Sequence, residues 1–157
     1  MSKNLLLDTT FLLPYFGLDL GNINAFVDTL YEKLPKLYFA EISVYEAKFK
    51  IVSLYRKKRI PWVIVNNFGA NLSVLEDSKK IIFIKYCRNV DRYVNELENK
   101  LPRKLGILDE IIVATAISFG NLLTIDEKIL ELKRELKEDF GLEVLSYEKF
   151  SEFGTVE

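Results

Sequence analysis

The stretch GILDEIIVATAISFGNLLTIDEKIL, residues 106–130, decides the fold. Asp109 comes just before an apolar run that closes at Gly120, which predicts a buried helix with a glycine stop. Residues 121–125 are short and apolar, which predicts a buried strand. Asp126 stands where that strand gives way to an amphipathic helix over residues 127–140. The stretch therefore places two carboxylates at the ends of secondary-structure elements.

These positions matter because an open parallel α/β sheet binds its ligands outside the carboxyl ends of the strands. Asp126 lies at such an end, and Asp109, at the start of the preceding helix, is expected to face it. Like charges placed close together favour a hard divalent cation between them. There is a simpler alternative for each residue taken singly: Asp is a favoured N-cap, so each could cap its own helix without taking part in any chemistry.

The composition excludes several classes of site. The 157 residues are 49% hydrophobic with net charge −1, which predicts one domain over residues 1–157 and no basic field to hold nucleic acid. The single cysteine, Cys87, excludes an internal disulfide and a Cys-based zinc site, and the absence of histidine excludes His-containing triads and His-ligated metals. No apolar run reaches membrane length and no basic leader precedes an apolar stretch, so we expect a cytoplasmic protein without a membrane partner.

The first third of the chain repeats the pattern of a strand followed by an acid. Residues 4–7 predict a strand ending at Asp8, residues 22–34 a helix, residues 37–42 a second strand and residues 43–56 a second helix. Ser43 and Glu46 have the spacing of a capping box, which competes with a ligand role for Glu46. Glu41 is a lesser candidate. The basic run at residues 56–59 is typical of a solvated helix end.

Further along, we expect a short helix over residues 61–68, a weak strand over 72–75, one long helix over 78–100 and a last strand over 143–145. The alternation of strands and helices predicts a parallel sheet with helices on both faces. In such a sheet the acids that follow strands or open helices share one edge, and those acids are Asp8, Glu46, Asp109 and Asp126.

Four segments in this order, LLLDTTFLL, ISVYEAKF, LDEIIVATA and LLTIDEKIL, resemble the PIN-domain nucleases, including the VapC toxins of prokaryotic toxin-antitoxin pairs. The resemblance extends over nearly the whole chain and implies a three-layer α/β/α fold with a central parallel sheet. It identifies the four acids as catalytic residues and ligands of Mg²⁺ or Mn²⁺, with Thr10 beside the first acid and Thr124 before the last as supporting hydroxyls. Residues 66–99 match the family poorly, and Glu110 adds an acid next to Asp109.

The resemblance implies a metal-dependent endoribonuclease that cleaves single-stranded RNA, with an antitoxin protein as a possible partner. The apolar faces of residues 22–34 and 78–97 look too large for one sheet face to cover, which predicts a homodimer or an antitoxin segment in that groove. Two alternatives remain open at this point. One is a catalytically inactive PIN-fold module for RNA binding or assembly, and the other is a response-regulator-like receiver, which also gathers acids at strand ends.

Overall fold

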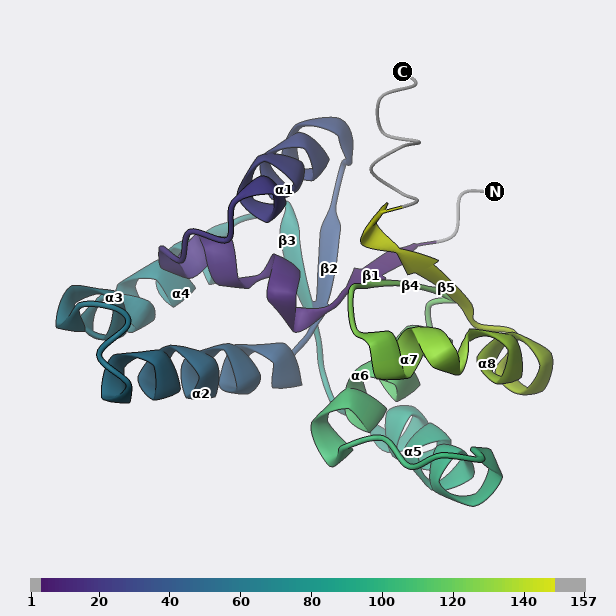
Figure 1. Ribbon diagram of the computed structural model, residues 1–157. Coiled ribbons are helices and arrows are strands. Elements are labelled where there is room, and N and C mark those ends of the chain that lie inside the picture. The colour runs from purple at the N-terminus through teal and green to yellow at the C-terminus, as the bar shows by residue number, and fades with distance from the viewer. Residues whose placement is uncertain (1–3, 149–157) are drawn as a thin grey trace.

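The computed structural model describes residues 4–148, and its centre is a sheet of five parallel strands in the order β3-β2-β1-β4-β5 (Figure 1). In register, Leu6 of β1 lies opposite Tyr38 of β2 on one side and Leu122 of β4 on the other. The strands are β1 (Leu5–Leu7), β2 (Leu37–Ala40), β3 (Ile81–Ile84), β4 (Asn121–Thr124) and β5 (Glu143–Ser146).

Helices cover both faces of the sheet, which makes three layers (Figure 1). One face carries two short 3-10 helices, η1 (Thr9–Phe11) and η2 (Leu13–Phe16), followed by α1 (Asn22–Lys33), α2 (Ile42–Arg56), α3 (Trp62–Asn66) and α4 (Phe68–Asp77). The other face carries α5 (Arg88–Lys100), α6 (Ile107–Ile117), α7 (Glu127–Glu131) and α8 (Lys133–Phe140).

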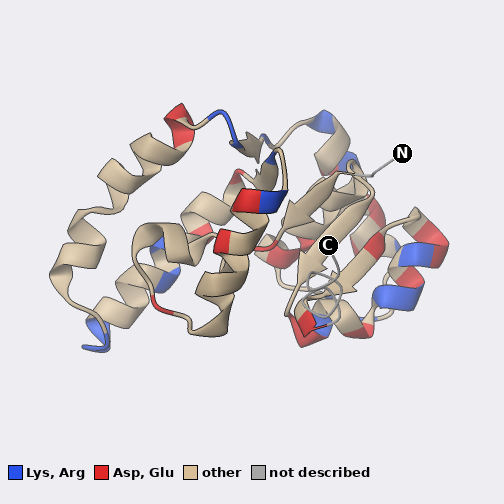
Figure 2. Cartoon of the chain, turned by 90° about the horizontal axis from the view of Figure 1, so that it is seen from above, with Lys and Arg blue, Asp and Glu red and all other residues tan. Residues whose placement is uncertain are grey.

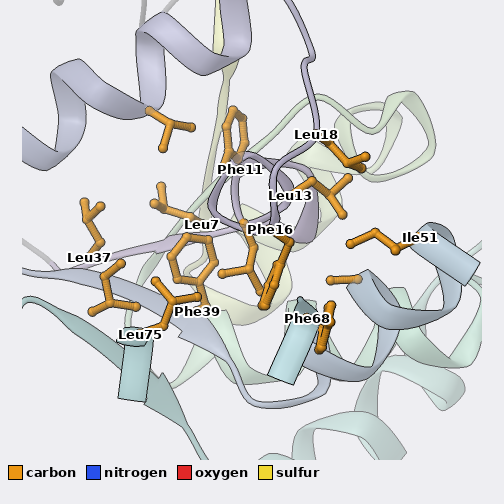
Figure 3. Packing of buried hydrophobic residues seen from close by; sticks show 14 of the residues in the cluster. Leu7, Phe11, Leu13, Phe16, Leu18, Leu37, Phe39, Ile51, Phe68 and Leu75 are labelled. Carbon is orange, nitrogen blue, oxygen red and sulfur yellow. The ribbon is translucent and has the colours of Figure 1, made fainter. Parts of the chain in front are cut away.

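The strands alternate their side chains between two separate cores, as a period of two requires. Leu7 and Leu123 point into the core beneath α1 to α4, whereas their neighbours Leu6 and Leu122 point into the core beneath α5 to α8. In the first core the rings of Phe16 and Phe68 stack, with centroids 4.0 Å apart and planes 7° apart, and this pair holds η2 against α4 (Figure 3). Burial on both faces explains why the strands are almost wholly apolar.

The sequence predicted the architecture correctly. The three-layer α/β/α fold with its parallel sheet is confirmed, as are the strands at residues 4–7, 37–42, 121–125 and 143–145, with their ends shifted by one or two residues. The strand order also excludes the receiver alternative, because receivers have the order 2-1-3-4-5.

Three predictions for residues 72–140 were wrong. The expected strand at residues 72–75 is part of α4, where Phe68, Leu72 and Leu75 follow the helical spacing. The expected long helix at 78–100 is two elements, β3 and α5: the run Ile81–Ile84 consists of isoleucine and phenylalanine, which favour strands. The expected helix at 127–140 is divided into α7 and α8 at Leu132.

Within residues 4–148, no helix is both long enough and apolar enough to span a membrane. The expected tail at residues 147–153 falls largely outside the described residues.

Candidate active site

The four predicted acids lie around the point where the winding of the sheet reverses. From β1 the chain passes outward through β2 to β3 and then returns to place β4 on the other side of β1. A parallel sheet forms its ligand crevice at such a switch point, outside the carboxyl ends of the strands. Asp8 directly follows β1, and Asp126 follows β4 by two residues, so both carboxylates lie at this crevice.

Asp8 is buried at the carboxyl end of β1, with only 5% of its surface exposed. One carboxylate oxygen accepts a hydrogen bond of 2.7 Å from the backbone N–H of Thr9, and the other accepts one of 2.6 Å from the Thr124 hydroxyl. Burial raises the pKa of Asp8, the two hydrogen bonds lower it, the charge of Glu46 raises it and the charge of Lys50 lowers it. The fold therefore fixes an acid where its charged form is poorly solvated.

Two hydroxyls support this acid. The Thr124 hydroxyl, which donates to Asp8, also accepts a 3.0 Å hydrogen bond from the backbone N–H of Asp126, so it links the first and last acids. The Thr9 hydroxyl donates to the Ser43 hydroxyl over 2.9 Å, which ties the end of β1 to the first turn of α2. The supporting role predicted for Thr124 agrees with these contacts. Thr10 makes no hydrogen bond to a carboxylate in the part of the chain that the structure describes, whereas the backbone N–H of Thr9 donates to Asp8.

Asp126 is an N-cap, as the simpler alternative proposed. One of its carboxylate oxygens, Oδ1, accepts hydrogen bonds from the backbone N–H groups of Lys128 at 2.9 Å and Ile129 at 3.3 Å at the start of α7. These bonds use one oxygen and fix the side chain. Capping and a role in the acid cluster are therefore compatible, because the second oxygen takes no part in the cap.

Asp109 is not a cap. The residue at the N-cap of α6 is Gly106, no side chain caps this helix, and Asp109 lies in its first turn. Its pKa is raised to about 6, first by burial and then by the negative charges of the other acids, with Lys50 acting in the opposite direction. The acids that raise this pKa are, in order of effect, Asp126, Asp8 and Glu46. Helix capping therefore does not account for Asp109, whereas its electrostatic interaction with the other three acids does.

Glu46 belongs to the same group, and the capping box proposed for it was wrong. Helix α2 begins at Ile42, one residue earlier than expected, with Glu41 at its N-cap and no side-chain cap. Ser43 is fully buried and accepts from Thr9. The Glu46 carboxylate lies on the next turn, 3.6 Å from the Lys50 ammonium. Its charge acts on both Asp8 and Asp109.

The two lesser acids lie elsewhere. Glu110 is 2% exposed and turns toward α5, where burial, a hydrogen bond with Glu98 and the charge of Glu98 raise its pKa to about 7, against a smaller lowering by Lys104. Its Oε1 atom is buried without a hydrogen-bond partner in residues 4–148. Glu41 lines a cavity of about 490 Å³ with Tyr45 and Lys85 beside the edge strand β3. The charges that shift the pKa of Asp109 come instead from Asp126, Asp8, Glu46 and Lys50.

The donor chemistry of the cluster suits a hard divalent cation. Asp8, Asp109, Asp126 and Glu46 offer only carboxylate oxygens, which Mg²⁺ and Mn²⁺ prefer. Among the described residues, no three His, Cys, Asp or Glu side chains are already arranged to ligate a metal ion. Burial is the first cause of the raised pKa of Asp109 and repulsion by the other acids the second, and a cation between the carboxylates removes that repulsion.

The fold is shared with solved structures of bacterial proteins. VapBC2 from Rickettsia felis, bound to a fragment of its promoter DNA, aligns with 91% of this chain and 98% of its own at a TM-score of 0.61 and 16% identity. Mycobacterium tuberculosis VapC20, a toxin that cleaves the sarcin-ricin loop, aligns with 82% of this chain and 94% of its own at a TM-score of 0.58 and 13% identity. The protein has the PIN fold.

FitAcB from Neisseria gonorrhoeae is similar to the same degree, with a TM-score of 0.57, 18% identity and coverage of 90% of this chain and 96% of its own. No family model matches the sequence, and no curated protein is detectably similar to it. The PIN fold is thus retained at a sequence identity too low to transfer residue roles, and those roles must be argued from the geometry of the acids.

Sequence reasoning missed three residues of this site. Thr9 and Ser43 form the hydroxyl bridge, and Lys50 supplies a positive charge that lowers the pKa of both Asp8 and Asp109. Lys50 has a signal in the sequence, because it follows Glu46 by four residues on a helix and such pairs are neighbours. The hydroxyl bridge between Thr9 and Ser43 has no signal in the sequence, because it joins residues 34 positions apart.

Proposed function

We propose that this PIN-fold protein is a cytoplasmic, divalent-metal-dependent endoribonuclease that cleaves single-stranded RNA as the toxin of a toxin-antitoxin pair. The observation that carries the proposal is the gathering of four acids from separate elements at the switch point of the sheet: burial raises the pKa of Asp109 first, and the charges of the other three acids raise it further. Strongly perturbed carboxylates in a crevice are typical of functional sites. The likeness to a toxin that cleaves the sarcin-ricin loop supports the choice of reaction.

In this proposal Asp8, Asp109 and Asp126 hold Mg²⁺ or Mn²⁺, and Glu46 binds through water or orients the nucleophile. The metal supplies a bound water of lowered pKa and stabilises the charge that develops on the phosphate. The chain's own contribution is positional. The Thr124 hydroxyl and the backbone N–H of Thr9 hold the Asp8 carboxylate in place and oppose the rise that burial causes in its pKa, and the α7 cap fixes Asp126.

An antitoxin and a second copy of the chain are the proposed partners. Two of the similar structures, VapBC2 and FitAcB, carry the names of two-component assemblies. Residues 60–75, which include α3 and most of α4, contain no charged residue, and Trp62, Val63 and Val74 are more than half exposed there. A face of this composition is typical of a protein-protein contact.

The test is an RNA cleavage assay with Mn²⁺ and with EDTA, on wild type and Asp109→Asn side by side. We expect cleavage by the wild type with Mn²⁺ and none with EDTA or with the variant. A matched control is Asp91→Asn, which changes a carboxylate in the first turn of α5, away from the cluster. Equal cleavage by wild type and Asp109→Asn would remove the catalytic assignment. No cleavage by the wild type over a broad RNA panel would favour an inactive binding module instead.

A further inference from the structure

Helix α2 carries a strip of exposed, mainly aromatic and basic side chains that begins at Tyr45, the residue before Glu46 of the acid cluster. Its members are Tyr45, Phe49, Ser53, Arg56 and Lys57, and we call them the α2 strip. Tyr45 is 56% and Phe49 65% exposed, which is unusual for aromatic side chains of this size. The positions are spaced by three and four residues, with Lys57 beside Arg56, so they lie along one side of the helix.

The charge of this region differs from that of the whole chain. Residues 42–59 contain six basic residues (Lys48, Lys50, Arg56, Lys57, Lys58 and Arg59) and one acid, Glu46, so their net charge is +5. The complete chain has a net charge of −1. Figure 2 shows acidic and basic residues interspersed along the helices on the other side of the sheet. The basic charge that phosphate binding requires is therefore concentrated on α2 and the turn after it.

The side chains of the strip border an open space on the surface of the helix. Phe49, Ser53, Arg56 and Lys57, with Lys48 and Val52, line this space of about 530 Å³. An aromatic ring thus lies toward the start of the strip and two cations at its end. From Glu46 to Lys57 the helix rises by about 16 Å, which is enough for a few nucleotides.

We propose that the α2 strip is the track for single-stranded RNA that leads into the acid cluster, with Phe49 stacking on an unpaired base and Arg56 and Lys57 contacting the phosphates. Nonspecific single-strand binding combines these two features, because every base has an aromatic face and every nucleotide a charge. The assignment of RNA as the occupant rests on the proposed function. A protein partner is disfavoured here by the charge, and the uncharged surface of residues 60–75 suits such a partner better.

The track is tested by direct binding. The full chain is titrated into a short, unstructured, fluorescein-labelled RNA in EDTA, and anisotropy gives the Kd without cleavage. We expect Phe49→Ala to weaken binding roughly 5- to 150-fold and Phe49→Trp to restore it. We expect Arg56→Gln/Lys57→Gln to reduce the slope of log K against log salt by about 0.7 for each phosphate that no longer has a cation beside it. Duplex RNA, whose bases cannot stack on Phe49, should bind weakly and be insensitive to Phe49→Ala.

Two controls match these changes elsewhere on the surface. Val74→Ala removes an exposed apolar side chain from α4, and Arg134→Gln/Lys137→Gln removes two exposed cations from α8. Neither should change the Kd. Unchanged melting temperatures are expected for all variants because the altered side chains are exposed.

Equal RNA affinity in wild type and both strip variants would overturn the track. So would a Phe49→Ala protein that keeps its RNA affinity but changes its sedimentation, because that result makes the strip a protein contact. The outcomes for the track and for the proposed function are separable. RNA binding that depends on the α2 strip, without metal-dependent cleavage, would refute the nuclease function and support the RNA track. Cleavage that depends on Asp109 but not on the α2 strip would support the nuclease function and refute the track.

Discussion

Replacing Asp109 by Asn should stabilise the metal-free protein. In EDTA the wild type must hold an ionised Asp109 against three neighbouring acids, which raise its pKa together with burial. The variant keeps the shape of the side chain and removes the charge. A residue that served only as a helix cap would give the opposite result, or none, because Asn caps helices about as well as Asp.

The size of the effect follows from the structure. A rise of the pKa from 3.8 to about 6 corresponds to about 3 kcal/mol if it is taken in full. Asp109 is only half-buried, so solvent screening reduces this to roughly 1–2 kcal/mol. The loss of a negative charge in the first turn of α6 costs about 0.3–1 kcal/mol in the other direction. The expected net stabilisation is about 1 kcal/mol, or a melting temperature higher by about 2–4 °C.

The direction of the pKa shift determines how the stability difference between the variant and wild type depends on pH. The pKa of Asp109 is raised by folding, so its favourable contribution is complete below pH 3.8 and is lost as the pH rises to about 6. The gain of the variant over wild type should therefore be absent near pH 4 and complete at pH 8. Thermal melts followed by circular dichroism in EDTA at the two pH values measure it, with Asp91→Asn as the control that should not gain. An Asp109→Asn protein that melts at or below the wild-type temperature at pH 8 would refute the electrostatic cluster.

Three further predictions concern the surroundings of the acids. Glu110→Gln should flatten the fall in stability between pH 4.5 and about 7, because burial beside Glu98 raises the pKa of Glu110 to about 7. Denaturant titrations across this pH range measure the free energy of unfolding, and an unchanged dependence on pH would contradict the prediction. Lys50→Met should lower the melting temperature in EDTA and enlarge the rise in melting temperature caused by Mn²⁺, because Lys50 is a positive charge that already acts on the acid cluster. Scanning fluorimetry with and without Mn²⁺ measures both effects, and an unchanged Mn²⁺ response would count against the prediction. Thr124→Val should destabilise the fold by about 1–3 kcal/mol, because it leaves an Asp8 carboxylate oxygen and the Asp126 backbone N–H without their shared hydrogen-bond partner. An unchanged midpoint of urea unfolding would disprove this.

The sequence was sufficient for four of the five strands and for the positions of the four acids, because both depend on local patterns. Short apolar runs ending in an acid predicted β1 and β4, and the alternation of elements predicted their parallel arrangement. The failure at β3 has a physical cause. The spacing of Ile82 and Tyr86 continues into the helical pattern of α5, and only the composition of the run marks it as a strand. The order of strands in space is set by long-range packing.

The interactions between the acids were less predictable than their positions. A capping box was expected from Ser43 and Glu46, but α2 begins one residue earlier, and burial then directs Ser43 to Thr9. Asp126 and Asp109 looked equivalent in sequence, yet one caps its helix and the other does not. Helix boundaries inferred from sequence are uncertain by one or two residues, which is enough to change the role of a side chain near a helix start.

A calorimetric titration of Mn²⁺ into the intact wild-type protein and into Asp8→Asn and Asp109→Asn tests directly whether the acids bind a metal. If the four acids form one metal site, the wild type should bind Mn²⁺ with an affinity that falls as the pH drops below about 6, and each variant should bind far more weakly. No heat of binding by the wild type at millimolar Mn²⁺, or binding that both variants retain in full, would contradict it.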